Sequence, residues 1–302
     1  MDVSRTPKEV QVIHGHVFRN DQVLPIEKVR LSPGQAGLLN GWGIFTTLRI
    51  VQGEAFAYER HWRRLEKDAG LLRLPMPYAA AKVRVHLQEV IRANQVTEGC
   101  ARIYLVYNQI GFWRSDENFP STDLIIYTAP LPSYREPVRL GVRENGRHAG
   151  SPLAGTKVTS WLTNVWAVAE AQGQGYDEVV LLNERGEVAE CTAANIFCVH
   201  GQKVFTPPLA SGCLEGITRG ILMEIAPEAN VSVVEQTLRL EDLSTAEEVF
   251  ISSTNRNLLP VGEVAGRAIA QAPGPVTQRL NQAFDAFVMD YISRRVASSA
   301  RA

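Results

Sequence analysis

The segment Pro-Leu-Ala-Gly-Thr-Lys-Val-Thr-Ser-Trp-Leu (152–162) places one lysine, Lys157, among small and apolar residues. A second segment, Val-Ala-Glu-Cys-Thr-Ala-Ala-Asn-Ile-Phe (188–197), does the same for a carboxylate, Glu190. Desolvation lowers the pKa of a lysine and favours its nucleophilic free amine. The pair therefore suits covalent chemistry at the amine, with the carboxylate stabilising a nearby positive charge. Taken alone, Lys157 is equally explained as a lysine that extends to solvent from a helix start.

The other lysines have polar surroundings. Lys8 lies in a polar N-terminal segment, and Lys203 lies in a predicted hairpin turn, His-Gly-Gln-Lys. Lys67 and Lys82 fall on polar faces of amphipathic segments, and Lys28 precedes a short apolar run. Lys157 is therefore the preferred candidate nucleophile.

Two segments are candidates for binding a phosphate. Leu-Glu-Gly-Ile-Thr-Arg (214–219) precedes an apolar helical stretch, so the N–H groups of Ile217 and Thr218 would point at an anion. Ser-Ser-Thr-Asn (252–255) follows an apolar strand. An ordinary helix N-cap and a serine/threonine turn explain the same two patterns.

An arginine is the third candidate phosphate ligand. In His61-Trp-Arg-Arg-Leu65, either Arg63 or Arg64 could serve on chemistry alone, and either could be a solvated helix residue. No GxGxxG motif follows a strand and no Walker A motif is present, so the common nucleotide-binding signatures are not supported. His14-Gly-His16 lacks further ligands nearby, and no metal site is predicted.

Taken in order, these motifs match a known pattern that runs from about residue 11 to about residue 290. The matching pieces are Gly43-Ile-Phe-Thr-Thr-Leu-Arg49, His61-x-x-Arg64-Leu65, Lys157, Glu190-Cys-Thr-Ala-Ala-Asn195-Ile-Phe, Phe205-Thr-Pro-Pro208, Gly216-Ile-Thr-Arg219 and Glu248-Val-Phe-Ile-Ser-Ser-Thr254. In order and spacing the chain resembles the class IV (fold type IV) pyridoxal phosphate enzymes, which include branched-chain and D-amino-acid aminotransferases and aminodeoxychorismate lyase.

The resemblance implies roles for particular residues. It implies pyridoxal 5′-phosphate as cofactor, Lys157 as the catalytic Schiff-base lysine and Glu190 at the pyridine nitrogen. On the cofactor phosphate it implies four ligands: Arg64, Ile217, Thr218 and Thr254. It also implies an α+β fold, with a small N-terminal α+β domain and a larger C-terminal barrel-like α/β domain. A second subunit completes the site, so a homodimer is expected.

The reaction is less sharply defined than the family. Thr46 stands where many aminotransferases have glutamate, and the motifs around Lys157 and Glu190 look more like some aminodeoxychorismate lyases. Tyr-Asn-Gln (107–109) replaces an arginine-containing motif of D-amino-acid aminotransferases. Candidate substrate contacts are Thr46, Arg102, Asn108 and Trp161, with Arg114, Arg147 and Arg256 as further candidate carboxylate ligands.

The leading prediction is transfer of an amino group from a hydrophobic or small amino acid to a 2-keto acid. Four aromatic residues supply apolar surface that suits such a donor: Trp42, Phe45, Trp113 and Trp161. The alternatives are an aminodeoxychorismate lyase, which releases p-aminobenzoate and pyruvate, and a catalytically silent relative. Retention of Lys157 and Glu190 argues against the silent relative.

Composition sets the remaining expectations. The 302 residues suit two domains, predicted at 1–130 and 138–302 with a Pro-rich linker at 131–137. A net charge of −1 gives no electrostatic signature of nucleic acid or membrane binding. The four cysteines form no CxxC pair and the first residues have no signal-peptide pattern, so free thiols and a cytoplasmic location are expected.

Hydrophobic periodicity predicts the secondary structure. Helices are expected over 58–72, 79–94, 160–173, 217–226 and 275–295. A hairpin is expected over 10–19 and 22–30. Further strands are expected over 101–107, 123–129, 138–144, 178–183, 187–190, 195–206, 231–235 and 248–253.

Overall fold

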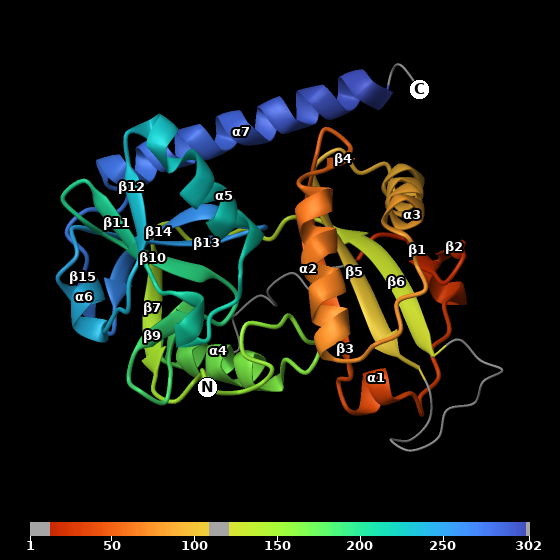
Figure 1. Cartoon of the computed structure of the whole chain (residues 1–302), viewed down its shortest axis with the longest axis horizontal. Coiled ribbons are helices and arrows are strands. Elements are labelled where there is room, and N and C mark those ends of the chain that lie inside the picture. Colours follow the sequence, from red (N-terminus) through yellow and green to blue (C-terminus); the bar gives the residue numbers. More distant parts are fainter. Residues whose placement is uncertain (1–12, 109–120, 300–302) are drawn as a thin grey trace, which may run out of the picture.

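The computed structural model describes residues 13–108 and 121–299, which form two halves, each built on its own β-sheet (Figure 1). The first sheet has six strands in the order β2-β1-β6-β5-β3-β4, and the second has nine. In the second sheet the path runs β12-β11-β10-β13-β14-β7-β8-β9, with β15 beside β14. This sheet curls into a half-barrel that mixes parallel and antiparallel pairs. The predicted α+β class is confirmed.

The N-terminal half packs its two long helices against one face of the six-stranded sheet. Its elements are β1 (His16–Arg19), β2 (Gln22–Pro25), η1 (Ile26–Lys28), α1 (Ala36–Leu39), β3 (Gly43–Val51), β4 (Glu54–Ala55), α2 (Tyr58–Leu71), α3 (Ala80–Ala93), β5 (Gly99–Tyr107) and β6 (Thr122–Ala129). Trp62, Leu65 and Ala69 recur at helical spacing on α2 and are buried against the sheet.

The C-terminal half begins after residues 130–137. Its elements are β7 (Val138–Arg143), α4 (Leu162–Gly173), β8 (Glu178–Leu182), β9 (Val188–Cys191), β10 (Asn195–His200), β11 (Lys203–Thr206), η2 (Leu209–Ser211), α5 (Ile217–Ile225), η3 (Ala226–Ala229), β12 (Ser232–Glu235), α6 (Leu240–Ser244), β13 (Glu248–Ser253), β14 (Asn257–Val264), β15 (Arg267–Ala268) and α7 (Pro275–Ser299). The interior of the half-barrel is filled by aliphatic side chains, among them Leu140, Ile196 and Val261.

Helix α7 extends from the C-terminal half over the top of the N-terminal half (Figure 1). Phe56 of the N-terminal half packs edge-on against Phe284 and Tyr291 of α7, and the Tyr291 hydroxyl donates to Glu59. The two halves therefore share a hydrophobic contact beyond their connecting segment. No helix among the described residues is long and apolar enough to cross a membrane.

The predicted helices and the predicted N-terminal hairpin are present, with shifted ends. The predicted strand over 195–206 is two strands, β10 and β11, joined by a turn. Two long strands, β3 and β14, were not predicted. The burial pattern of β3 is nearly continuous rather than alternating, because one face packs on α2 and the other faces the C-terminal half. The four cysteines are buried and free.

Candidate active site

A cavity of about 310 Å³ lies between the two halves, lined by residues from both. The predicted site residues that it brings together are Arg64, Arg102, Lys157, Trp161, Glu190, Ile217, Thr218 and Thr254. They come from α2, β5, the segment before α4, β9, the start of α5 and the turn after β13. Within the described residues, no three His, Cys, Asp or Glu side chains are grouped to hold a metal ion.

Lys157 is held in place by the opposite half of the molecule. Its carbonyl accepts the backbone N–H of Phe45 at 3.0 Å, and its own N–H donates to the Asp68 carboxylate at 3.2 Å. The Lys157 amine lies 4.6 Å from the ring centre of Phe45 and 5.4 Å from that of Trp161. Burial, assisted by the nearby positive charge of Arg64, lowers the pKa of Lys157 to about 7. A large fraction of the amine is therefore unprotonated and nucleophilic near neutral pH.

Both carboxylate oxygens of Glu190 are engaged. Arg147 donates to Oε1 at 2.9 Å, and the backbone N–H of Leu214 donates to Oε2 at 3.0 Å. Arg147 is itself anchored by Asn164, which accepts from its Nη1 at 2.9 Å. Donors on both oxygens fix the orientation of the carboxylate. The site thus presents a fixed negative charge to its cavity.

The end of the cavity lined by Gly216, Ile217 and Thr218 is rich in hydroxyl groups and unpartnered polar atoms. Helix α5 begins here, and its first N–H groups have no partner within the helix. Three buried polar atoms beside it, Ser252 Oγ, Ser253 Oγ and Asn255 Oδ1, have no hydrogen-bond partner in the described part of the chain. Gly216 is required at the helix start, because a Cβ there would come within 1.9 Å of Asn195 Oδ1. Orphaned donors at a helix N-terminus make an anion site.

Arg64 faces this end of the cavity, whereas Arg63 is exposed. The predicted substrate contact Thr46 lies elsewhere. Its side chain points from β3 toward α2, is 1% exposed, and accepts a hydrogen bond from Arg64 Nη2 at 3.1 Å. Side chains alternate along a strand, so Phe45 and Thr47 line the cavity instead. Thr46 itself does not line the cavity.

Asn108 is also absent from the cavity lining, because its amide donates to Asp123 at 3.2 Å. Two of the candidate carboxylate-binding arginines are already paired. Arg147 binds Glu190, and Arg256 binds the buried Glu178 at 3.0 Å. Within residues 13–108 and 121–299, the hydrogen bonds of the Arg102 guanidinium go to two tyrosine hydroxyls. Arg114 and Trp113 lie outside the described residues.

Several lining residues were not predicted: Thr47, Pro132, Tyr134, Asn164 and Thr192. Pro132 and Tyr134 lie in the segment that was predicted to be a linker, and nothing in its composition indicates that it faces a site. Ser252, by contrast, belongs to the Ser-Ser-Thr-Asn motif that was predicted as a candidate phosphate-binding segment. Asn164 and Thr192 depend on the packing of α4 against β9, which no local pattern reveals.

The chain is similar to known aminotransferases over most of its length. Residues 43–264 match the family model described as Amino-transferase class IV. The branched-chain-amino-acid aminotransferase of Escherichia coli (strain K12) is 29% identical over 282 residues, covering 89% of this chain and 91% of that protein. The D-alanine aminotransferase of Listeria monocytogenes serotype 4b (strain F2365) is 29% identical, covering 89% of this chain and 94% of the relative.

A solved structure gives the same result. The T.th. branched-chain amino acid aminotransferase with pyridoxamine 5′-phosphate superposes with a TM-score of 0.85 at 25% identity, covering 92% of this chain and 95% of that one. These relatives favour the aminotransferase prediction over the lyase alternative. Because the family model matches most of its length, the chain belongs to the class IV aminotransferases.

Proposed function

We propose that the protein uses pyridoxal 5′-phosphate to transfer an amino group from a hydrophobic or small amino acid to a 2-keto acid. The observation that carries the proposal is the cavity itself. It places a lysine amine with a pKa lowered to about 7 together with a fixed carboxylate and a cradle of unsatisfied donors.

The cofactor's phosphate fits the donor-rich end of the cavity. Ile217 and Thr218 supply free N–H groups, and Thr254 lines the same end beside the unpartnered Ser252 and Ser253 hydroxyls. Arg64 adds a positive charge from the other half. The phosphate would therefore bridge the two halves, bound by neutral donors on one side and a guanidinium on the other.

At the other end of the cavity, Glu190 would hold the ring nitrogen in its protonated state. Arg147 and the Leu214 N–H fix the orientation of the carboxylate. When bound, the protonated cofactor ring accepts the electron pair left on the substrate Cα. A residue that keeps that ring protonated therefore lowers the barrier to removing the Cα proton.

Lys157 would move that proton. Its amine lies inside the cavity over Phe45 and Trp161, whose rings meet edge to face with centres 5.8 Å apart. A base works best when its pKa lies near the working pH, and the pKa of Lys157, about 7, meets that condition. Burial and the positive charge of Arg64 are the main causes of this lowered pKa.

Arg102 is the best-placed group for a substrate carboxylate. It lies opposite Thr47 in the β3–β5 register, and both line the cavity. Its Nη1 donates to the Tyr104 and Tyr127 hydroxyls at 3.3 and 3.4 Å, which leaves further guanidinium donors. The neighbouring walls, Phe45 and Trp161, are apolar and suit a hydrophobic donor side chain.

The first half-reaction tests this function. Adding one amino donor at a time to the cofactor-loaded protein should convert the cofactor to its pyridoxamine form, with no keto acid present. A panel of L- and D-amino acids identifies the donor, and the Lys157→Ala variant is the control without the base. If no donor produces that form, while aminodeoxychorismate yields p-aminobenzoate and pyruvate, the function is a lyase.

We also propose a homodimer whose interface adjoins the cavity. Four large apolar side chains on α1 and α4 are exposed: Leu38 (58%), Leu39 (66%), Leu162 (79%) and Trp166 (52%). The α1 and α4 regions that carry them meet where Gly41 touches Ser160. Sedimentation equilibrium should give twice the chain mass, and Leu39→Asp with Leu162→Asp should give the monomer. A monomeric wild-type protein would refute the dimer.

Two further expectations remain proposals. The domain boundaries, 1–130 and 138–302, are supported by the separate sheets on either side of residues 130–137. A cytoplasmic location is supported by four buried cysteines that are all free thiols.

A further inference from the structure

We propose that Thr46 and His61 are positioning residues that orient Arg64 toward the cofactor phosphate. The inference rests on the proposed role of Arg64 as a phosphate ligand. All three side chains are buried, with exposed fractions of 1% for Thr46, 1% for His61 and 8% for Arg64. Only Arg64 lines the cavity, so Thr46 and His61 act on the phosphate only through it.

The hydrogen bonds have a defined direction. Arg64 Nη2 lies 3.1 Å from Thr46 Oγ1, and a guanidinium only donates, so the hydroxyl oxygen accepts. The same hydroxyl lies 2.8 Å from His61 Nδ1 and has its proton left to donate there. In the proposed arrangement the hydroxyl donates this proton to His61, which accepts at Nδ1 and carries its own proton at Nε2. The chain of donation runs from Arg64 through Thr46 to His61.

This chain works only while His61 is neutral. Burial and the adjacent positive charges of Arg64 and Lys157 hold the pKa of His61 well below its usual range. A protonated ring would carry a hydrogen on Nδ1 and could not accept from Thr46. The Thr46 hydroxyl would then turn, and the bond that fixes Arg64 Nη2 would weaken.

This chain of hydrogen bonds, which we call the relay, holds the Arg64 guanidinium in place without neutralising its charge. The other bond of Arg64 runs from Nη1 to the backbone carbonyl of Glu215 at 3.2 Å. Among the described residues, no carboxylate oxygen lies within ion-pair distance of Arg64. A glutamate at position 46 would face the guanidinium directly and compete with a phosphate dianion for it. Threonine fixes the same geometry and leaves the full positive charge for the ligand.

The geometry of two elements makes the arrangement possible. His61 and Arg64 are three residues apart on α2, so they share one face of the helix. Thr46 lies on the face of β3 that packs on α2, between the cavity-facing Phe45 and Thr47. Loss of the hydroxyl removes one hydrogen bond to a charged group, worth about tenfold in cofactor affinity.

The test compares two cofactor forms that differ only in the phosphate. Apo-protein is titrated with pyridoxal 5′-phosphate and, separately, with pyridoxal, and both dissociation constants are measured by absorbance. Thr46→Val and His61→Leu should each weaken pyridoxal phosphate about tenfold and leave pyridoxal unchanged. Thr46→Ser keeps the hydroxyl and should bind like wild type. In an Arg64→Ala background, Thr46→Val should have no further effect.

Thr128→Val is the matched control. Thr128 is also fully buried in the same sheet, and its hydroxyl also bonds a histidine ring nitrogen, His14 Nδ1, at 2.8 Å. This variant should lose stability without losing phosphate selectivity. Equal weakening of both cofactor forms by Thr46→Val, or unchanged affinity, would overturn the relay. If Arg64→Ala retains the wild-type preference for the phosphorylated form, the phosphate role of Arg64 fails as well.

Discussion

The arginines around the cavity are held differently in the two halves of the molecule. In the C-terminal half, Arg147 and Arg256 are bound to the carboxylates of Glu190 and Glu178. In the N-terminal half, Arg64 and Arg102 are held by hydroxyl groups and a backbone carbonyl. The arginines paired with carboxylates form part of the cavity wall and fix an acidic group. The arginines held by neutral partners have no carboxylate to offset their charge, so they can bind an anionic group of the cofactor or substrate. The chemistry of each partner thus indicates the function of each arginine.

The most severe test of this comparison is at Lys157, where the halves meet. The C-terminal half supplies the amine, and β3 of the N-terminal half holds its backbone. Lys157→Ala should lower the rate of amino transfer roughly 10⁴-fold, because it removes the amine that moves the proton. The exposed Lys203→Ala variant should retain wild-type activity. The assignment is wrong if borohydride fixes the cofactor to a peptide that lacks Lys157.

The acidic group fixed by Arg147 gives the next largest effect. Glu190→Gln should fold and bind cofactor, because an amide oxygen can still accept from Arg147 or from the Leu214 N–H. Its kcat should fall about 10²-fold, because an amide cannot stabilise the charge on the cofactor ring. Glu170→Gln, which loses only an exposed pair with Arg143, is the control. Near-wild-type turnover by Glu190→Gln would contradict the role.

A pair of arginine variants separates the two classes directly. Arg256→Leu leaves the buried Glu178 carboxylate without its partner and should lower the free energy of unfolding by roughly 3 kcal/mol. Arg102→Leu leaves no buried charge without a partner, so it should lower the free energy of unfolding by only about 1 kcal/mol. Its main effect should be a higher KM for the substrate that Arg102 binds. Urea denaturation and steady-state kinetics measure both. Equal destabilisation would remove the distinction between the classes.

The smallest effect expected is a shift in pH dependence. Apo-protein should capture pyridoxal covalently, as trapped by borohydride, with a midpoint near pH 7, because Lys157 has a pKa of about 7. Below that pH the amine is protonated and does not react. Arg64→Ala removes a positive charge that lowers this pKa, so the midpoint should move to higher pH. The exposed Arg63→Ala should leave it in place. A midpoint unmoved by Arg64→Ala would show that its charge does not reach the amine.

The sequence predicts elements with one buried face better than elements buried on both. Helices α2 and α3 alternate apolar and polar faces, and both are present close to their predicted ranges. Strand β3 is nearly all buried, so it shows no period, and residue 46 could not be assigned to a face. A shift of one residue on a strand moves a side chain to the opposite side, so the sequence alone did not show whether Thr46 or Thr47 faces the cavity.

The ion pairs of the cavity arginines could also not be predicted from the sequence. Arg147 and Glu190 are 43 residues apart, and Arg256 and Glu178 are 78 apart. Only the folded half-barrel brings each pair together, so these arginines looked the same as Arg102. By contrast, the site residues that the family resemblance implied all line one cavity, because each falls within a short motif with a fixed local geometry.

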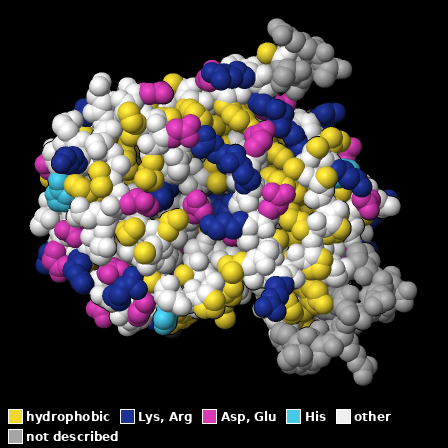
Figure 2. Space-filling view, viewed as in Figure 1, with side chains coloured by type: hydrophobic (Ala, Val, Ile, Leu, Met, Phe, Trp, Pro, Cys, Tyr) yellow, Lys and Arg dark blue, Asp and Glu magenta, His cyan; other side chains and the backbone are white. Residues whose placement is uncertain are grey.

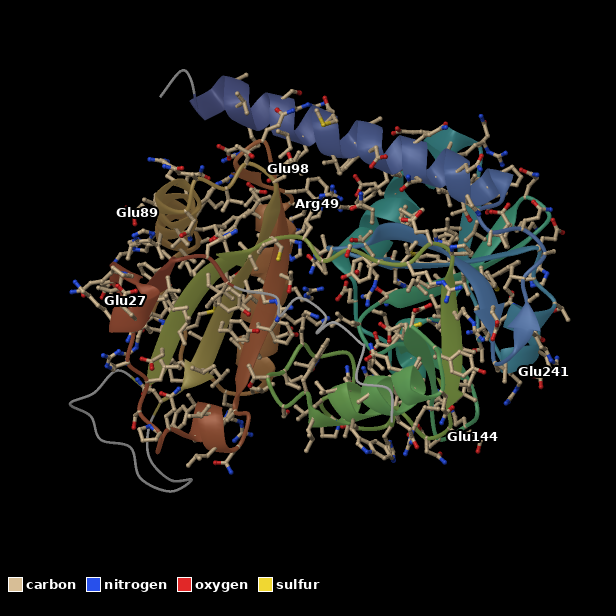
Figure 3. All side chains as sticks on the ribbon, turned by 180° about the vertical axis from the view of Figure 1, so that it is seen from behind. Glu27, Arg49, Glu89, Glu98, Glu144 and Glu241 are labelled. Carbon is tan, nitrogen blue, oxygen red and sulfur yellow. The ribbon has the colours of Figure 1, made fainter. Side chains whose placement is uncertain are left out.

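Contacts between the halves also include exposed ion pairs from α2, such as Arg60 with Glu224 and Lys67 with Glu215. Figure 2 shows basic and acidic side chains mixed along this boundary. On the opposite face, Figure 3 labels Arg49, which extends from β3 to bond Asn257 shortly after the turn that holds Thr254. Exposed pairs contribute little stability each. The half-buried Arg49 contact is the better candidate for coupling the phosphate end of the cavity to β3.

The long reach of α7 has a consequence for how the protein is made. Domains form from the N-terminus as the chain leaves the ribosome. Yet Phe56 and Glu59 in the N-terminal half find their partners on α7, which is translated after every other described element. During synthesis, Phe56 therefore lacks its aromatic partners until α7 has been translated.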